Sequence, residues 1–183
     1  MSATPPVIPR SRWTRGDSPA VPVKPSELEG VAIHYPGTPE TIGRASEDSI
    51  ARRLEGYRVM HVRDKGWRDI AYNVAVDQSG RVWVLRGISR QSGANGTSAA
   101  NRSHGAVLVM VGNNEEPTPE CIAAIQYVIR LYDVRFPGRI RRVRPHSAFK
   151  QTSCPGDALR RLLNDGRTLY VSGARRAWPN VTA

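Results

Sequence analysis

The strongest constraint on the fold is the alternation of short apolar runs with segments that carry helix start signals. Residues 30–35 (GVAIHY) and 104–111 (HGAVLVMV) are apolar runs of strand length, which is typical of buried strands. Segments with a helical pattern separate these runs and follow them. This alternation predicts the α/β class, with a single domain in which a central mixed β-sheet is flanked by α-helices.

Three helices are predicted from their ends and their apolar spacing. A helix over residues 46–54 begins at Ser46, a suitable N-cap that is followed by two acidic residues. A helix over residues 118–132 begins at the cap Thr118, with a proline at its first position and isoleucines along one face. The last helix is predicted over residues 157–164, where three leucines are apolar.

The remaining sheet elements are predicted from residue type. Residues 70–77 and 81–86 are rich in Val and aromatic side chains and flank a Gln-Ser-Gly turn, which predicts a β-hairpin. Residues 87–102 are small and polar, which predicts a surface loop. Val143 marks a weak strand end.

The chain divides into three parts at the sequence level. Residues 1–28 are Pro-rich and are predicted to form an extended arm that lies on the domain or is partly loose. Residues 29–166 form the folded domain, with Gly166 as the stop of its last helix. Residues 167–183 form a C-terminal tail.

The charge of the chain is strongly positive. Lys and Arg number 27 against 16 Asp and Glu, a net charge of +11, which attracts polyanions such as nucleic acid, anionic membranes and cell-wall polymers. An Arg-rich stretch over residues 135–144 lacks an aromatic stacking platform, zinc-finger spacing or a helix-turn-helix signal, so no nucleic acid is expected as a partner. The longest aliphatic run, 106–111, is too short to span a bilayer, so no membrane insertion is expected. The alternative to attraction of a polyanion is that the basic residues form an ordinary solvated surface.

The two cysteines, Cys121 and Cys154, are too few for a disulfide framework. Cys121 falls on the apolar face of the helix after Thr118, where core packing is the simplest interpretation. The N-terminal sequence MSATPPVIPRSRW has Pro and Arg where a secretory signal has an apolar core. We therefore expect synthesis in the cytoplasm without a signal peptide.

His34, His146 and Cys154 are the candidate metal ligands. His34 ends the first predicted strand, and the other two flank a loop just before the last helix. Ligands of open α/β sheets gather at such strand ends. Two imidazoles and one thiolate would make a zinc site with one open position, as in catalytic zinc sites. The spacing alone leaves open the alternative that the three are ordinary core residues.

Five segments of the chain form an ordered set of motifs. They are Arg12-Trp13, the strand ending VAIHY, residues 66–87 (GWRDIAYNVAVDQSGRVWVLRG), Asn101 with residues 105–113 (GAVLVMVGN), and residues 146–156 (HSAFKQTSCPG). This set resembles the type 2 N-acetylmuramoyl-L-alanine amidases, the zinc amidase superfamily that includes amidase-type phage lysozymes and peptidoglycan recognition proteins. The resemblance covers roughly residues 10–165.

The resemblance implies a zinc-dependent amidase with one Zn2+ per chain, bound by His34, His146 and Cys154. Residues 29–166 would then be the catalytic domain. The resemblance further implies that Tyr72 and Thr152 are catalytic, as hydrogen-bond donors to the attacking water or the developing oxyanion. Zinc would polarise the scissile carbonyl and lower the pKa of water. Some relatives carry a Glu base on the strand over 105–111, and this chain has none there, so the general base stays open.

The substrate-binding residues are expected at His61, Gly66 and Trp67. Relatives often have a groove-lining His before the Gly-Trp pair, and in recognition proteins that pair is linked to diaminopimelate-type stem peptides. Two positions depart from the family pattern. His104 stands where an apolar residue is usual, and Asn95 stands where many relatives read Gly-Ala-His.

The expected function is hydrolysis of the amide between the lactyl group of N-acetylmuramic acid and L-Ala in peptidoglycan. The expected partner is the bacterial cell wall, and the chain is expected to be a monomer. We expect a phage or prophage endolysin that stays in the cytoplasm of the producing cell and acts on the wall after release. One alternative is a non-catalytic peptidoglycan-binding protein on the same fold, in which the metal Cys is typically replaced. A basic nucleic-acid-binding protein is the other.

Overall fold

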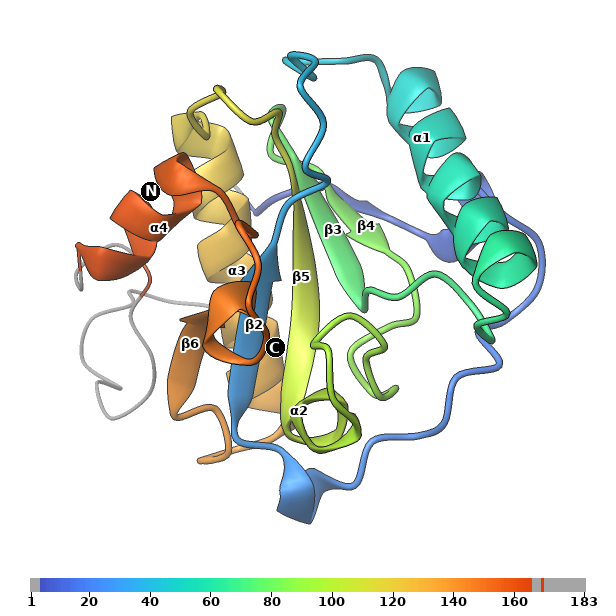
Figure 1. Cartoon of the computed structure of the whole chain (residues 1–183), viewed down its shortest axis with the longest axis vertical. Coiled ribbons are helices and arrows are strands. Elements are labelled where there is room, and N and C mark those ends of the chain that lie inside the picture. The colour runs from blue at the N-terminus through green and yellow to red at the C-terminus, as the bar shows by residue number, and fades with distance from the viewer. Residues whose placement is uncertain (1–3, 166–168, 170–183) are drawn as a thin grey trace.

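The computed structural model describes residues 4–165 and 169, and within them it confirms the predicted α/β class (Figure 1). A six-stranded mixed sheet has the order β1-β4-β3-β5-β2-β6. The strands are β1 (Val7–Ile8), β2 (Gly30–His34), β3 (Val74–Asp77), β4 (Val82–Val84), β5 (His104–Met110) and β6 (Arg142–Pro145). The helices are α1 (Glu47–Val59), α2 (Ser98–Ser103), α3 (Pro119–Arg135) and α4 (Asp157–Asn164).

Parallel pairing dominates the centre of the sheet. β5 lies between β3 and β2 and is parallel to both, and β6 is parallel to β2. β3 and β4 form the predicted antiparallel hairpin. Every residue of β2 and β5 is buried, because helices or loops cover both faces of these strands. This burial explains why both strands read as continuous apolar runs in the sequence.

Helices cover the two faces of the sheet with separate apolar clusters (Figure 1). Val107 and Val109 of β5 pack in the cluster that contains α3. Leu108 alternates with them and packs in the second cluster, which contains Ile50 of α1. His34 is paired with Leu108 and therefore projects from the same face as that residue. In Figure 1 α1 lies toward β3 and β4, whereas the short turn His146–Ala148 contacts β2.

The predicted helix starts are confirmed, and two helices are longer than predicted. The Ser46 side chain accepts a hydrogen bond from the backbone N–H of Ser49, and Thr118 caps α3 in the same way. α1 continues to Val59 and α3 to Arg135. The predicted helix over 157–164 is α4.

Both predicted hairpin strands are too long, since β4 spans only Val82–Val84 of the predicted 81–86, and one predicted loop contains a helix. β3 begins at Val74 and not at residue 70, because the Asn73 side chain binds the carbonyl oxygens of Gly87 and Arg90 and holds this stretch in a loop. The predicted loop over 87–102 contains the short helix α2, which is capped by Thr97. α2 lacks the apolar periodicity that would have revealed it.

The Pro-rich arm is bound closely to the domain. Its strand β1 pairs in parallel with β4, and Trp13 is buried and donates from its indole nitrogen to the Val84 carbonyl at 2.9 Å. The stop expected at Gly166 and the tail over 167–183, apart from Leu169, lie outside the described residues. No helix among the described residues is long and apolar enough to cross a membrane.

Candidate metal centre and adjoining pocket

Strand register brings His34 and His146 together. His34 ends β2, and His146 directly follows β6, which runs parallel to β2. Because Ile33 is paired with Pro145, the next residue of each segment emerges at the same edge of the sheet. The two imidazole centroids lie 4.4 Å apart.

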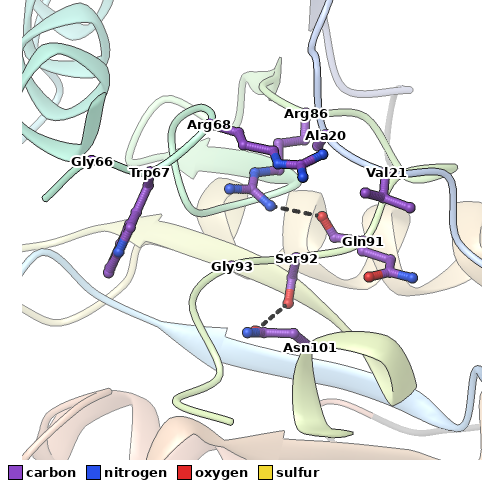
Figure 2. A pocket seen from close by; sticks show the side chains of 10 residues that line it. All are labelled: Ala20, Val21, Gly66, Trp67, Arg68, Arg86, Gln91, Ser92, Gly93 and Asn101. Atoms are coloured by element: carbon purple, nitrogen blue, oxygen red, sulfur yellow. Dashed lines mark hydrogen bonds between the residues drawn. The ribbon is translucent and has the colours of Figure 1, made fainter. Parts of the chain in front are cut away.

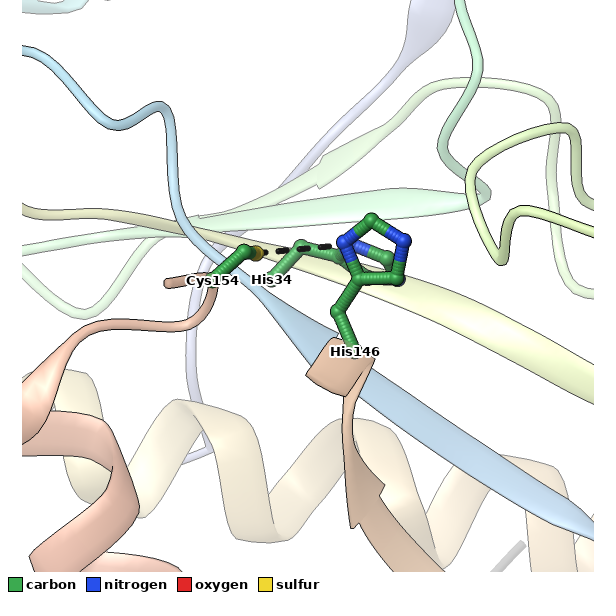
Figure 3. A group of neighbouring side chains, drawn as sticks. All are labelled: His34, His146 and Cys154. Carbon is green, nitrogen blue, oxygen red and sulfur yellow. Dashed lines mark hydrogen bonds between the residues drawn. The ribbon is translucent and has the colours of Figure 1, made fainter. Parts of the chain in front are cut away.

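Cys154 completes the group by way of the loop after His146. The Ser147 N–H donates to the Cys154 carbonyl at 3.1 Å and closes that loop. The Cys154 Sγ lies 3.8 Å from Nδ1 of His34, and the ligand atoms of the three residues all lie within 4.8 Å of one another (Figure 3). No fourth His, Cys, Asp or Glu from the described part of the chain joins them. Two nitrogens and one sulfur fit a zinc ion with one position open.

The protonation states suit a cation. Burial lowers the pKa of His34 to about 3, and repulsion from His146 adds to this effect. Burial also lowers the pKa of His146 and raises that of the Cys154 thiol to about 11. Near neutral pH, both imidazoles are therefore uncharged and free to ligate. The thiol would lose its proton to solvent when a metal ion binds the sulfur.

Tyr72 lies directly against this centre. Its ring is 5.4 Å from the His34 ring in an edge-to-face arrangement. Burial raises the pKa of the Tyr72 phenol, and the nearby Cys154 raises it further. The hydroxyl thus remains protonated and is able to donate a hydrogen bond, as the predicted catalytic role requires.

Thr152 has a structural contact near the centre. Its hydroxyl oxygen accepts from the Cys154 N–H at 3.2 Å, and its carbonyl accepts from Arg160 at 3.1 Å. These contacts hold the loop that carries the thiol. The catalytic role of Thr152 stays a prediction.

His61, Gly66 and Trp67 lie together at the end of α1. His61 belongs to a π-helical turn, Met60–Asp64, and its ring stacks on Trp67 at 4.9 Å. Gly66 has φ +64°, a conformation that favours glycine, and the turn there lets the Trp67 N–H donate to the His61 carbonyl at 3.0 Å. The His61 ring also lies 6.0 Å from Tyr72. A continuous series of ring contacts therefore links Trp67 to the candidate metal ligands.

A pocket of about 360 Å³ opens beside Trp67 (Figure 2). The lining comes from the arm, from the segment after α1 and from the loop before α2, and consists of Ala20, Val21, Gly66, Trp67, Arg68, Arg86, Gln91, Ser92, Gly93 and Asn101. Burial lowers the pKa of the Arg86 guanidinium to about 10, which leaves it cationic at neutral pH. The pocket thus offers one indole surface and two guanidinium groups.

Two polar residues of this region could not be placed from the sequence alone, the half-buried Arg86 and the fully buried Asn95. Arg86 lies within the segment that carries the family motif, but its basic side chain gave no sign of facing a pocket. Asn95 was seen only as a departure from the family pattern, and the structure places its Oδ1 2.9 Å from Nε2 of His34.

Cys121 is fully buried in the core cluster that includes α3, and His104 is buried against Phe149, with ring centroids 4.7 Å apart.

Comparisons with known proteins agree with the fold. No protein-family model matches the chain. Mouse peptidoglycan recognition protein 1 is 26% identical over 159 residues, which cover 84% of this chain and 83% of that protein. The structure of bumblebee PGRP-SA matches with a TM-score of 0.76 at 23% identity, covering 88% of this chain and 95% of that one. PGRP-LE, solved in complex with tracheal cytotoxin, a monomeric diaminopimelic acid-type peptidoglycan, matches with a TM-score of 0.71 at 24% identity over 94% of each chain.

The chain is thus similar in sequence to peptidoglycan recognition proteins and shares the amidase-type fold of their solved structures.

Proposed function

We propose that this chain is a zinc-dependent N-acetylmuramoyl-L-alanine amidase, a hydrolase of linear amides. The observation that carries the proposal is the convergence of His34, His146 and Cys154 within 4.8 Å, with Tyr72 against them. Three protein ligands leave a position for water or substrate, whereas structural zinc sites usually have four.

Each side chain has a role that its surroundings allow. A zinc ion held by these ligands would act as a Lewis acid toward the scissile carbonyl and lower the pKa of water. Tyr72 keeps its proton and donates a hydrogen bond to charge that develops on the reacting oxygen. Thr152 holds the thiol loop through the Cys154 N–H, and its hydroxyl proton is free to act as a second donor.

The pocket beside Trp67 would take the stem peptide. Arg68 and Arg86 suit a substrate that carries a free carboxylate, and the Trp67 ring offers an apolar wall. Diaminopimelate carries one more carboxylate than lysine, and the similar protein PGRP-LE was solved with a peptidoglycan of that type. We expect tighter binding of diaminopimelate-type than of Lys-type muropeptides, and equal affinity for the two would remove this part of the proposal.

The biological setting is proposed from the sequence. We propose an endolysin that is stored in the cytoplasm, works as a monomer and reaches the wall after a partner permeabilises the membrane. Co-expression with such a partner should lyse a bacterial host, and expression of the chain alone should not. Lysis that does not require the partner would contradict this setting.

A non-catalytic peptidoglycan receptor is the second candidate. It is favoured by the relatives, which are named as recognition proteins. Cys154 speaks against it, since the resemblance implies that this residue is typically replaced in receptors. Binding of cell wall with no release of amino groups would favour the receptor.

Metal content and wall hydrolysis test the enzyme directly. The wild type should contain about one zinc per chain and release L-Ala amino groups from purified cell wall. A chelator should abolish the activity, and zinc should restore it. Cys154→Ser should lose both metal and activity, whereas Cys121→Ala, which removes the other buried thiol, should keep both. An active Cys154→Ser variant would refute the proposed centre.

A further inference from the structure

Asn95 is the one buried polar side chain that hydrogen-bonds to a candidate metal ligand from outside the ligand group, within the described residues. It is fully buried in the loop before α2, and its Oδ1 lies 2.9 Å from Nε2 of His34, 61 positions away in the sequence. A polar contact inside a dry environment is costly unless donor and acceptor match. The hydrogen atoms of this pair can therefore be assigned from their surroundings.

The orientation of the Asn95 amide is fixed by its other contacts. Its Nδ2 lies 2.8 Å from the carbonyl oxygen of His104 and 3.1 Å from that of Ala100. Both oxygens are acceptors only, so they must face the NH2 group. The Ser92 hydroxyl donates to Asn101 at 3.0 Å and is thus also an acceptor toward Nδ2, at 2.9 Å. The amide oxygen must consequently face His34.

This orientation dictates the tautomer of His34. An amide oxygen only accepts, so Nε2 of His34 has to carry the hydrogen. In a neutral imidazole the other nitrogen then holds the lone pair. That nitrogen, Nδ1, is the atom that lies 3.8 Å from the Cys154 Sγ.

We propose that Asn95 is a positioning residue that locks His34 in the Nε2–H tautomer and thereby presents Nδ1 to the zinc ion. The inference rests on the metal site of the proposed function. Groups that accept from the second nitrogen of a metal-bound His orient the ring and typically change metal affinity 10–100-fold. Asn95 is also neutral, so zinc with one thiolate keeps a net positive charge, which a carboxylate at this position would cancel.

The backbone around Asn95 keeps the amide in place. Its N–H donates to the Asn101 side chain at 2.8 Å, and α2 begins two residues later at the cap Thr97. Asn95, which departs from the family pattern, is therefore held in a fixed loop by hydrogen bonds.

The test compares Asn95→Ala with Asn73→Ala. Asn73 is an equally buried asparagine whose amide makes three hydrogen bonds to backbone groups and none to His34. Metal-free wild type, labelled with ¹⁵N-histidine, should show His34 as the Nε2–H tautomer by NMR. Asn95→Ala should show mixed tautomers and bind zinc about 10–100-fold more weakly in competition with a chelator. Asn73→Ala should lower thermal stability and leave the His34 tautomer and the zinc affinity unchanged.

Three results would overturn the inference. They are an Nδ1–H tautomer in the wild type, an unchanged zinc affinity in Asn95→Ala, and an equal loss of affinity in Asn73→Ala. The tautomer of His34 is measured in the wild type and needs no variant. An Nδ1–H tautomer there would therefore overturn the inference even if Asn95→Ala does not fold. A wild type that binds zinc with the expected tautomer but does not hydrolyse cell wall would remove the proposed function and leave this inference standing.

Discussion

The Cys154 thiol should make zinc affinity depend on pH, because zinc binding should release one proton from this thiol. Burial raises its pKa from 9.0 to about 11, so the metal-free protein holds a protonated thiol across the neutral range. Burial lowers the pKa of His34 to about 3 and also lowers that of His146, so neither imidazole holds a proton near neutrality. Zinc binds the thiolate, and binding must therefore release one proton from sulfur and none from the histidines.

The size of the effect follows from this count. Through the thiol alone, each pH unit between about 7 and 10 should raise zinc affinity tenfold, or about 1.4 kcal/mol. From pH 7 to pH 9 this contribution should reach about 100-fold. A thiol with the ordinary pKa of 9.0 would level off near pH 9, whereas the buried Cys154 thiol should keep the full slope to about pH 10.

Competition against a chelator of known pH dependence would measure this slope, and calorimetry in buffers of different ionisation enthalpy would count the protons. Cys121→Ala is the matched control, because it removes the other buried thiol and keeps the candidate ligands. Below about pH 7, where water on zinc still holds its protons, both proteins should release one proton per zinc ion. Release of none would mean that the Cys154 thiol is already ionised, release of two would mean that a histidine is protonated as well, and either result would refute the reasoning.

Three further predictions follow from other contacts. Tyr72→Phe should keep its zinc and lose about 10²–10³-fold in wall hydrolysis, measured as released amino groups, because it lacks one donor to the transition state. Asp69→Ala should lower the free energy of unfolding in urea by about 3–5 kcal/mol, because it leaves the guanidinium of Arg10, 3.0 Å away and largely buried, without its partner. Burial lowers the pKa of His104 to about 4, so the metal-free chain should lose stability as the pH falls from about 6.5 to 4, where the unfolded chain takes up the proton first. In His104→Leu this acid loss should shrink by up to about 3 kcal/mol in urea titrations at each pH, and an unchanged acid profile would contradict the assignment.

The parts of the fold that were predictable are those with local causes. The runs that became β2 and β5 are apolar because both faces of each strand are buried. Ser46 and Thr118 marked helix starts because a cap acts on backbone groups within three residues. The three candidate metal ligands were chosen through the motifs around each of them, and the parallel register of β2 and β6 explains why His34 and His146 meet although they are distant in sequence.

What the sequence did not reveal depends on distant partners. β1 has only two residues and exists because β4 offers it an open edge. The Asn95 side chain reads as an ordinary loop residue until the fold brings it to His34. No propensity or spacing rule encodes such a contact, since its free energy comes from matching polar groups inside a dry environment.

The arm shows how a peripheral segment is tied to the pocket beside Trp67. Ser18 donates to Asp69 at 2.6 Å, and Arg10 pairs with the same buried carboxylate. Asp69 lies two residues after Trp67, so these contacts fix the segment that carries the indole. Ala20 and Val21 then supply part of the pocket wall itself. One buried carboxylate thus joins two of the three segments that line the pocket, and the arm forms part of the pocket wall together with the loop before α2.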